Sequence, residues 1–251
     1  MPFSSDTCSA ELLGGARRIA DEHGTWMTVH HSGGLTRALK DAGVLGENVL
    51  LAHAAGIDDE EVELIAEAGA SVVICPSTAL KEGSGLGRRK LPELMDHDVP
   101  VALGADSANS SNYLDAVRMM NAAALGFKDG RLDVSVVSAE AALEMATLAG
   151  AHALGFEAET GSIEVGKQAD LVVFDTQRAE WSALFDPVNN LIYAADGHSV
   201  HTVVAGGRVV VDAGRSVFAD EAHVAARVQE LGEALLARTG TQVNRGRWGV
   251  V

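Results

Sequence analysis

Three short apolar runs in the first half of the chain end in residues that bind metals or move protons. The run 101–103 leads into Asp106, and two earlier runs end in the histidines His30 and His53. Because the carboxyl ends of parallel strands meet at one edge of a sheet, a common edge would bring these side chains together. The alternative for Asp106 is a purely structural role, capping the helix expected near Asn112, since Asp is a favoured N-cap residue.

Helical patterns alternate with apolar runs between residues 9 and 103. The expected strands are 26–31, 48–53, 71–75 and 101–103, and the expected helices are 9–23, 35–43, 58–68 and 91–97. This alternation predicts an α/β fold with a parallel sheet and right-handed crossovers. Asp58 and Glu61 have the spacing of a capping box, which favours a helix start over a metal cluster in this acidic run. The glycine-rich segment 76–89 is expected to be a loop.

The pattern changes near Phe156. Two helical stretches, 113–125 and 138–154, precede this point, and the second is expected to break near Gly150. The runs that follow predict strands at 161–166, 170–175 and 203–211, separated by turns without helices of any length between them. A final helix is expected at 220–238. We therefore expect an α/β part with the parallel sheet over 1–155, a β-strand segment over 156–217, and a C-terminal helix and tail over 218–251.

Composition excludes several classes of partner. The formal net charge of −16 argues against nucleic acids and anionic membranes, which require basic surfaces. The two cysteines, Cys8 and Cys75, form neither a secreted disulfide framework nor a CxxC zinc motif, so a reducing cytoplasmic setting is expected. The N-terminus lacks the features of a signal peptide, and every apolar run is too short to span a bilayer.

Imidazoles and a carboxylate at one sheet edge suit a divalent metal, zinc first, with iron as the alternative. Such a metal makes hydroxide available near neutral pH for attack on a carbon–nitrogen or similar polar bond, while a nearby His and Asp shuttle protons. His31 points to the opposite strand face from His30, so only one of the two can face a common centre. The remaining histidines are interpreted as structural or solvated: His23, His97, His152, His198, His201 and His223.

Hydroxyl groups flank the predicted strand ends. Ser77 and Thr78 follow the third strand and Ser107 follows Asp106, so all three are candidate substrate-binding residues. The segment around Ser77 resembles a phosphate-binding loop only in its glycine content. It lacks the GK[ST] ending, which excludes a nucleotide-binding loop of that type.

Five motifs resemble the metal-dependent amidohydrolase superfamily, in the branch of the cytosine deaminases, guanine and adenosine-type deaminases and chlorohydrolases. They are VHHS, LLAHAAGIDDEEVELIAEAGASVVICPSTALKEGSG, VALGADSANSSN, TGSIEVGKQADLVVFD and DPVNNLIYAADGHSVHTVVAGGRVVV. They occur in the family's order and cover most of residues 9–211. The match is specific for the superfamily and not for a substrate.

The resemblance implies the second half of a TIM-like (β/α) barrel, about four parallel strands, plus a segment of a small β-sandwich that the family builds from both chain ends. By this resemblance His30 corresponds to the metal-binding histidine that ends the fifth barrel strand. Asp106 corresponds to the aspartate ending the eighth strand, which binds metal and relays a proton. His53 corresponds to the histidine ending the sixth strand, which contacts the substrate or the attacking hydroxide.

The sequence departs from the family pattern at three points. No His-x-His pair precedes His30, residues 32–34 stand where the family's shuttle glutamate is usually found, and Gly-Ala-Asp replaces the usual Gly-Thr-Asp before Ser107. A half-barrel also leaves unpaired edges and an apolar inner face. Such a chain is expected to aggregate, to close differently, or to pair with a second copy or a completing chain.

The leading functional hypothesis is therefore a metal-dependent aminohydrolase acting on carbon–nitrogen bonds of a cyclic, nitrogen-containing small molecule. Two alternatives stay open. One is a catalytically silent half-barrel remnant or interaction module, and the other is a chlorohydrolase or cyclic amidase of the same superfamily.

Overall fold

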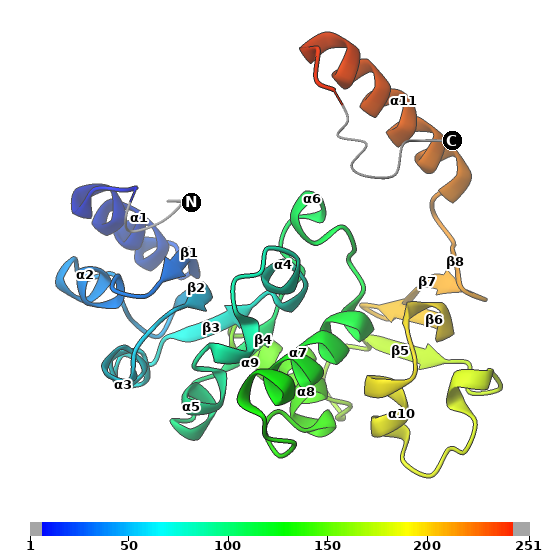
Figure 1. The fold of residues 1–251 in the computed structure, drawn as a ribbon, viewed down its shortest axis with the longest axis horizontal. Coiled ribbons are helices and arrows are strands. Elements are labelled where there is room, and N and C mark those ends of the chain that lie inside the picture. The colour runs from blue at the N-terminus through cyan, green and yellow to red at the C-terminus, as the bar shows by residue number, and fades with distance from the viewer. Residues whose placement is uncertain (1–6, 243–251) are drawn as a thin grey trace.

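A four-stranded parallel sheet organises the first half of the molecule in the computed structural model, which describes residues 7–242 (Figure 1). Its strands follow one another in sequence order: β1 (Met27–Ser32), β2 (Val49–Ala55), β3 (Ser71–Ile74) and β4 (Val101–Leu103). All neighbouring strands are parallel, as the alternating pattern predicted. The order agrees with part of a (β/α) barrel, although the described strands form an open sheet.

The four predicted helices of this part, one before β1 and three between strands, begin within one residue of their predicted starts. They are α1 (Ala10–Glu22), α2 (Thr36–Asp41), α3 (Asp59–Glu67) and α5 (Leu91–Asp96). The Asp58 carboxylate accepts a hydrogen bond from the Glu61 amide, and the Glu61 carboxylate accepts one from the Asp58 amide, which confirms the capping box. The acidic run is therefore a helix start.

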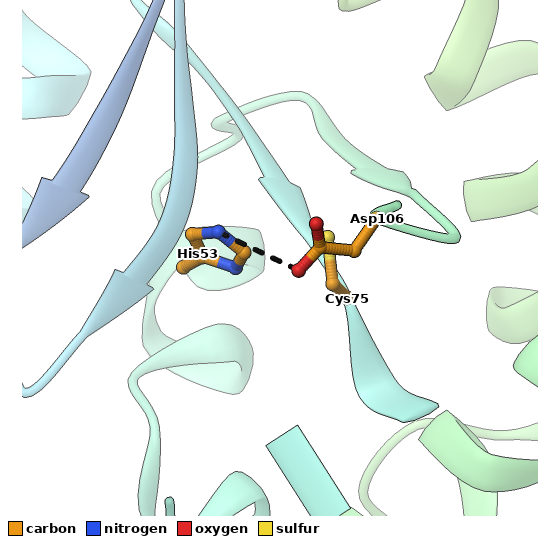
Figure 2. A group of neighbouring side chains, drawn as sticks. All are labelled: His53, Cys75 and Asp106. Atoms are coloured by element: carbon orange, nitrogen blue, oxygen red, sulfur yellow. Dashed lines mark ion pairs between the residues drawn. The ribbon is translucent and has the colours of Figure 1, made fainter. Parts of the chain in front are cut away.

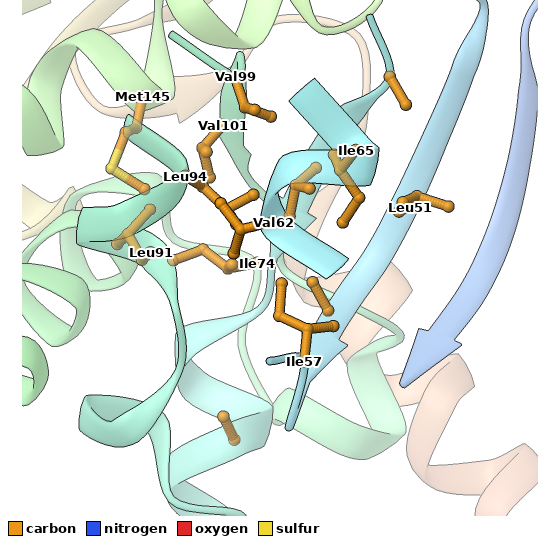
Figure 3. Packing of buried hydrophobic residues seen from close by; sticks show 14 of the residues in the cluster. Leu51, Ile57, Val62, Ile65, Ile74, Leu91, Leu94, Val99, Val101 and Met145 are labelled. Carbon is orange, nitrogen blue, oxygen red and sulfur yellow. The ribbon is translucent and has the colours of Figure 1, made fainter. Parts of the chain in front are cut away.

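The main core lies between the sheet and these helices. A row of register partners, Val29, Leu51, Val72 and Val101, runs across all four strands and is almost fully buried. Figure 3 shows side chains of α3 and α5 packed in the same core beside Leu51. The opposite sheet face carries a second, smaller cluster, formed by Leu50, Ala102 and Ala153.

The segment 76–89 is not the loop that its glycine content predicted. It contains α4 (Pro76–Lys81) and a 3-10 turn, η1 (Leu86–Arg88). Pro76 is pre-organised for a first helical turn. A Cβ on Gly87 would lie 2.5 Å from the Gly130 Cα, so this glycine permits close packing of η1 on a later helix.

Four helices follow β4 before the second sheet: α6 (Ala108–Ser111), α7 (Ala116–Arg131), α8 (Ala139–Ala146) and α9 (Leu148–His152). The predicted break in this helical stretch is present, three residues before Gly150: α8 ends at Ala146, and its C-cap Thr147 has non-helical φ and ψ of −127° and −98°. Asp106 caps neither α6, whose N-cap is Ser107, nor α7, whose N-cap is Asp115. The capping alternative for Asp106 is therefore wrong.

The second sheet is antiparallel, with the order β5 (Leu171–Phe174), β6 (Val200–Ala205), β7 (Arg208–Asp212) and β8 (Arg215–Ser216). The predicted strand 161–166 is wrong: these residues form turns and coil, and its two terminal glycines take positive φ angles. The run 203–211 is a hairpin that turns at Gly206 and Gly207, both with positive φ. The described residues form one sheet here, so the composite sandwich stays a prediction.

A helix lies between β5 and β6, where none was expected. It is α10 (Pro187–Tyr193), flanked by the 3-10 turns η2 (Ala179–Trp181) and η3 (Gly197–Ser199). Its Ile192 is fully buried in the main core, so the segment after Phe156 shares that core with the parallel sheet. The proposed domain boundaries remain predictions.

The last helix, α11 (Glu221–Thr239), begins after the N-cap Asp220 and projects away from both sheets (Figure 1). It has no buried residues. None of the helices within residues 7–242 is both long and apolar enough to cross a membrane. The expectations about the extreme N-terminus and the end of the tail fall on residues 1–6 and 243–251, outside the described residues.

Substitution Glu61→Ala is expected to lower the free energy of unfolding by about 2–3 kcal/mol, because the buried carboxylate also accepts hydrogen bonds from the Gly34 and Thr36 amides. Urea unfolding measures the change. Glu63→Ala, at an exposed position of the same helix, is the control and should stay within about 0.5 kcal/mol of the wild type. Equal effects would contradict the anchoring role.

The same carboxylate gives a pH dependence. Burial raises the pKa of Glu61, but the hydrogen bonds from Gly34, Thr36 and Asp58 outweigh it, so its pKa lies below the ordinary value of 4.5. The stabilisation by the ionised Glu61 carboxylate is fully present at pH values above 4.5 and is lost as the pH falls through the lowered pKa of the folded state. The stability difference between wild type and Glu61→Gln should therefore shrink as urea unfolding is repeated at falling pH.

Candidate metal and active site

Three side chains that can bind a metal meet at the carboxyl edge of the parallel sheet (Figure 2). His53 lies near the end of β2, Cys75 directly follows β3, and Asp106 follows β4. One potential ligand atom from each lies within 4.8 Å of the other two, and His53 Nε2 is 4.0 Å from Asp106 Oδ2. The predicted convergence of His53 and Asp106 is therefore observed, and Cys75 joins them.

Two of these residues have backbone conformations that L-amino acids rarely adopt. The φ angle is 77° at His53 and 60° at Asp106, both in the left-handed region. Such conformations cost about 1–3 kcal/mol each and cluster at functional sites. Here they lie in the last residues of β2 and just beyond the end of β4, where the backbone departs from regular strand geometry.

Gly104 allows β4 to approach Cys75. A Cβ at this position would lie 2.9 Å from Val73 Cγ2 and 3.3 Å from Cys75 Sγ. Any larger residue would push the end of β4, and with it Asp106, away from the cluster. Glycine in the motif before Asp106 therefore has a packing reason.

The structure separates the roles of the adjacent histidines. His31 is fully buried, and its Nε2 lies 3.0 Å from Thr36 Oγ1. Burial lowers the pKa of His31 to about 4, so its ring is neutral at physiological pH. The ring centroids of His30 and His53 are 4.7 Å apart. His30, and not His31, therefore lies against the cluster, although its role as a metal ligand stays a prediction.

A cavity of about 460 Å³ opens beside these groups. Thr78 and Ser107, two of the predicted substrate-binding residues, line it together with His30, His53 and Asp106. Ser77 lies outside this lining, and its hydroxyl donates a hydrogen bond of 2.6 Å to the Tyr113 hydroxyl oxygen. Substrate binding by all three residues remains a prediction.

Burial shapes the electrostatics of the cluster. Burial lowers the pKa of His53, the neighbouring His30 lowers it further, and the attraction of Asp106 opposes both effects. Burial, with the Asp106 carboxylate, raises the pKa of the Cys75 thiol to about 11. Without a bound cation, the imidazole of His53 is thus neutral and the thiol is protonated at neutral pH.

Arg89 supports His53 and was missed by the sequence reasoning. Its Nη1 donates a 3.1 Å hydrogen bond to the His53 carbonyl, and its Nη2 donates a 2.8 Å bond to Ser84 Oγ. Arg131 in turn donates to the Arg89 carbonyl. The guanidinium is buried, and burial lowers its pKa. In the sequence, Arg89 stands in the glycine-rich segment 76–89, which is typical of a solvent-exposed loop, so nothing marks this arginine as buried.

The donor set fits a borderline divalent cation. A neutral imidazole nitrogen, a cysteine sulfur and a carboxylate oxygen are all ordinary zinc ligands, and the second imidazole of His30 lies alongside. Cys75, like His53 and Asp106, lies near the carboxyl end of its strand. That shared place was the signal that could have found it.

The profile of the amidohydrolase family matches residues 1–210. The chain belongs to the amidohydrolase family. The 5'-deoxyadenosine deaminase of Methanopyrus kandleri is 33% identical over 248 residues, which cover 93% of this chain and 57% of that relative. The 5-methylthioadenosine/S-adenosylhomocysteine deaminase of Moorella thermoacetica is 35% identical over 241 residues, 90% of this chain and 56% of the relative. The resemblance inferred from the motifs is confirmed.

Solved structures agree with this assignment. An adenosine deaminase from Xanthomonas campestris with bound zinc superimposes with a TM-score of 0.89 at 30% identity, over 94% of this chain and 56% of its own. An atrazine chlorohydrolase from Arthrobacter aurescens complexed with zinc gives a TM-score of 0.83 at 24% identity, over 92% and 53% of the two chains, and shows the fold alone. This chain spans about half the length of the relatives it matches.

Arg89→Met should lower the free energy of unfolding by about 1–3 kcal/mol, because it leaves the His53 carbonyl without its buried donor. Thermal or urea unfolding checks this. The exposed neighbour offers the control Arg88→Met, which should change stability by less than about 0.5 kcal/mol. If the two variants are equally stable, the hydrogen bond from Arg89 does not hold the strained turn at His53.

Proposed function

We propose that this chain carries part of the active site of a zinc-dependent aminohydrolase that removes the exocyclic amine from the purine of an adenosine-like nucleoside. The meeting of His53, Asp106 and His30 at one sheet edge is the observation that carries this proposal. The support for the substrate class is that relatives more than 30% identical are deaminases of 5'-deoxyadenosine and of 5-methylthioadenosine or S-adenosylhomocysteine.

A zinc ion bound here would lower the pKa of a water molecule toward neutrality and so supply the nucleophile. In this proposal His30 and Asp106 would hold the ion. The Asp106 carboxylate accepts a proton from the attacking water. His53, whose Nε2 lies 4.0 Å from Asp106 Oδ2, is neutral because burial lowers its pKa, and its imidazole orients the attacking oxygen.

The proton collected by Asp106 is then passed to the leaving amine. The water oxygen stays on the ring carbon, the carbon–nitrogen bond breaks, and the amine departs as ammonia. Thr78 and Ser107 line the same cavity, and their hydroxyls would position the substrate, with Ser77 as the third predicted contact.

The proposed activity needs more of a barrel than the described sheet provides. The strand order leaves one edge of β1 and one edge of β4 without a neighbour among residues 7–242. We therefore propose that turnover requires another surface at these edges, from a second copy or from a completing chain.

Asp106→Ala should remove the metal and any turnover. The expected result is zinc in the purified wild type, zinc lost in the variant, and a fall in ammonia release from 5'-deoxyadenosine of about 10²–10⁴-fold wherever the wild type is active. Elemental analysis and an ammonia assay measure both. Asp96→Ala, at an exposed position in α5, is the control.

Each outcome decides between the hypotheses. Zinc retained by Asp106→Ala would overturn the proposed centre. A zinc-loaded wild type that releases no ammonia in any oligomeric state would support the catalytically silent alternative.

A further inference from the structure

We propose that Cys75 is a direct thiolate ligand of the cation at this sheet edge, so that the centre is a His–Cys–Asp site. This inference rests on the metal centre proposed above and changes its ligand set. The family resemblance assigns metal binding to His30 and Asp106 and gives Cys75 no role.

Strand order places Cys75 in the middle of the site. It follows β3, which pairs with β2 on one side and with β4 on the other, so its neighbours are the strands that carry His53 and Asp106. Figure 2 shows the thiol directly beside the Asp106 carboxylate and facing the same space as the His53 ring. A cation between His53 and Asp106 would therefore also be near the sulfur.

The spacing suits one tetrahedral ion after a small contraction. Ligand atoms around tetrahedral zinc are separated by about 3.3–3.6 Å, as follows from metal–ligand distances of about 2.0–2.3 Å. The three candidate atoms lie within 4.8 Å of one another, and the His53–Asp106 pair is at 4.0 Å. Side-chain rotations closing these gaps by up to about 1.5 Å produce the required geometry, leaving the fourth position for His30 or for water.

An ordinary buried cysteine is the alternative, since free cysteine often behaves as a small apolar residue. Cys75 is only 5% exposed, yet it belongs to neither apolar cluster found within residues 7–242. Its sulfur faces an imidazole and a carboxylate instead. This environment, together with the close approach that Gly104 allows, favours a ligand over a core residue.

Coordination must displace the thiol proton. Binding of the cation forms a metal–sulfur bond, breaks the sulfur–hydrogen bond and releases one proton to solvent. Thiolate ligands favour zinc, cadmium and cobalt over magnesium and manganese. The site would therefore prefer the softer ions, and oxidation of Cys75 would block it.

Cobalt is the probe that tests the inference without any turnover. Cobalt(II)-loaded wild type is expected to show a thiolate-to-cobalt charge-transfer band in the near ultraviolet. Cys8→Ser, which changes the other cysteine, should keep the band, while Cys75→Ser and Cys75→Ala should lose it. The two Cys75 variants should also bind zinc about 100-fold more weakly, since even loss of a partner outside the ligand set weakens metal sites by about 10–100-fold.

The outcomes separate this inference from the proposed function. Visible cobalt bands without a charge-transfer band in the wild type overturn thiolate ligation, whether or not the variants fold, and leave the zinc centre of His30 and Asp106 standing. Failure of the wild type to bind cobalt or zinc overturns both. A charge-transfer band that persists in Cys75→Ala and vanishes in Cys8→Ser also refutes the inference.

Discussion

The parallel register of four adjacent strands is the constraint on which the site depends. The row Val29–Leu51–Val72–Val101 fixes each strand against the next through buried apolar contacts on the helix-covered face. A shift of one residue in any strand would reverse which side chains face the core, so this register is strongly specified. The strands therefore end together, and the residues that follow them meet. The position of the cluster is a consequence of core packing, although none of its members packs in that core.

Local backbone conformations then orient these neighbouring side chains toward one another. The left-handed conformations at His53 and Asp106 lie in the last residues of β2 and just beyond the end of β4, at a cost that the surrounding contacts must offset. Arg89 holds the His53 carbonyl, and Glu61 holds the segment after β1 through the Gly34 and Thr36 amides. Both supporting side chains are buried charges that hydrogen-bond to backbone groups, so removing either leaves a backbone partner unsatisfied. The ends of β1 and β2 are thus fixed by side chains that lie outside the ligand set.

Sequence reasoning succeeded where periodicity and chain order determine structure. The parallel sheet, the helix start at Asp58 and the meeting of His53 with Asp106 all follow from apolar spacing and cap residues. It failed where long-range contacts decide. The glycine content of the segment 76–89 predicts a loop. In the structure, Gly87 instead allows the backbone of η1 to pack closely against Gly130 of α7. The run 161–166 has strand-like residues but lacks a strand partner. Arg89 could not be found from spacing alone, because its significance depends on which atoms the fold brings beside it, and Cys75 was marked only by its place next to a strand end.

Metal binding and turnover have different structural requirements in this chain. His53, Cys75 and Asp106 come from three neighbouring strands whose geometry is set by the described sheet and its helices, so the cluster is complete without further strands. A substrate pocket also requires walls that enclose the substrate. The other sheet face, with Leu50 and Ala102, borders an apolar cavity of about 1020 Å³ that α7 to α9 and the second sheet only partly enclose. In the proposed function, the three ligand atoms can therefore meet within the described sheet, whereas turnover depends on a further surface that closes this face and excludes water.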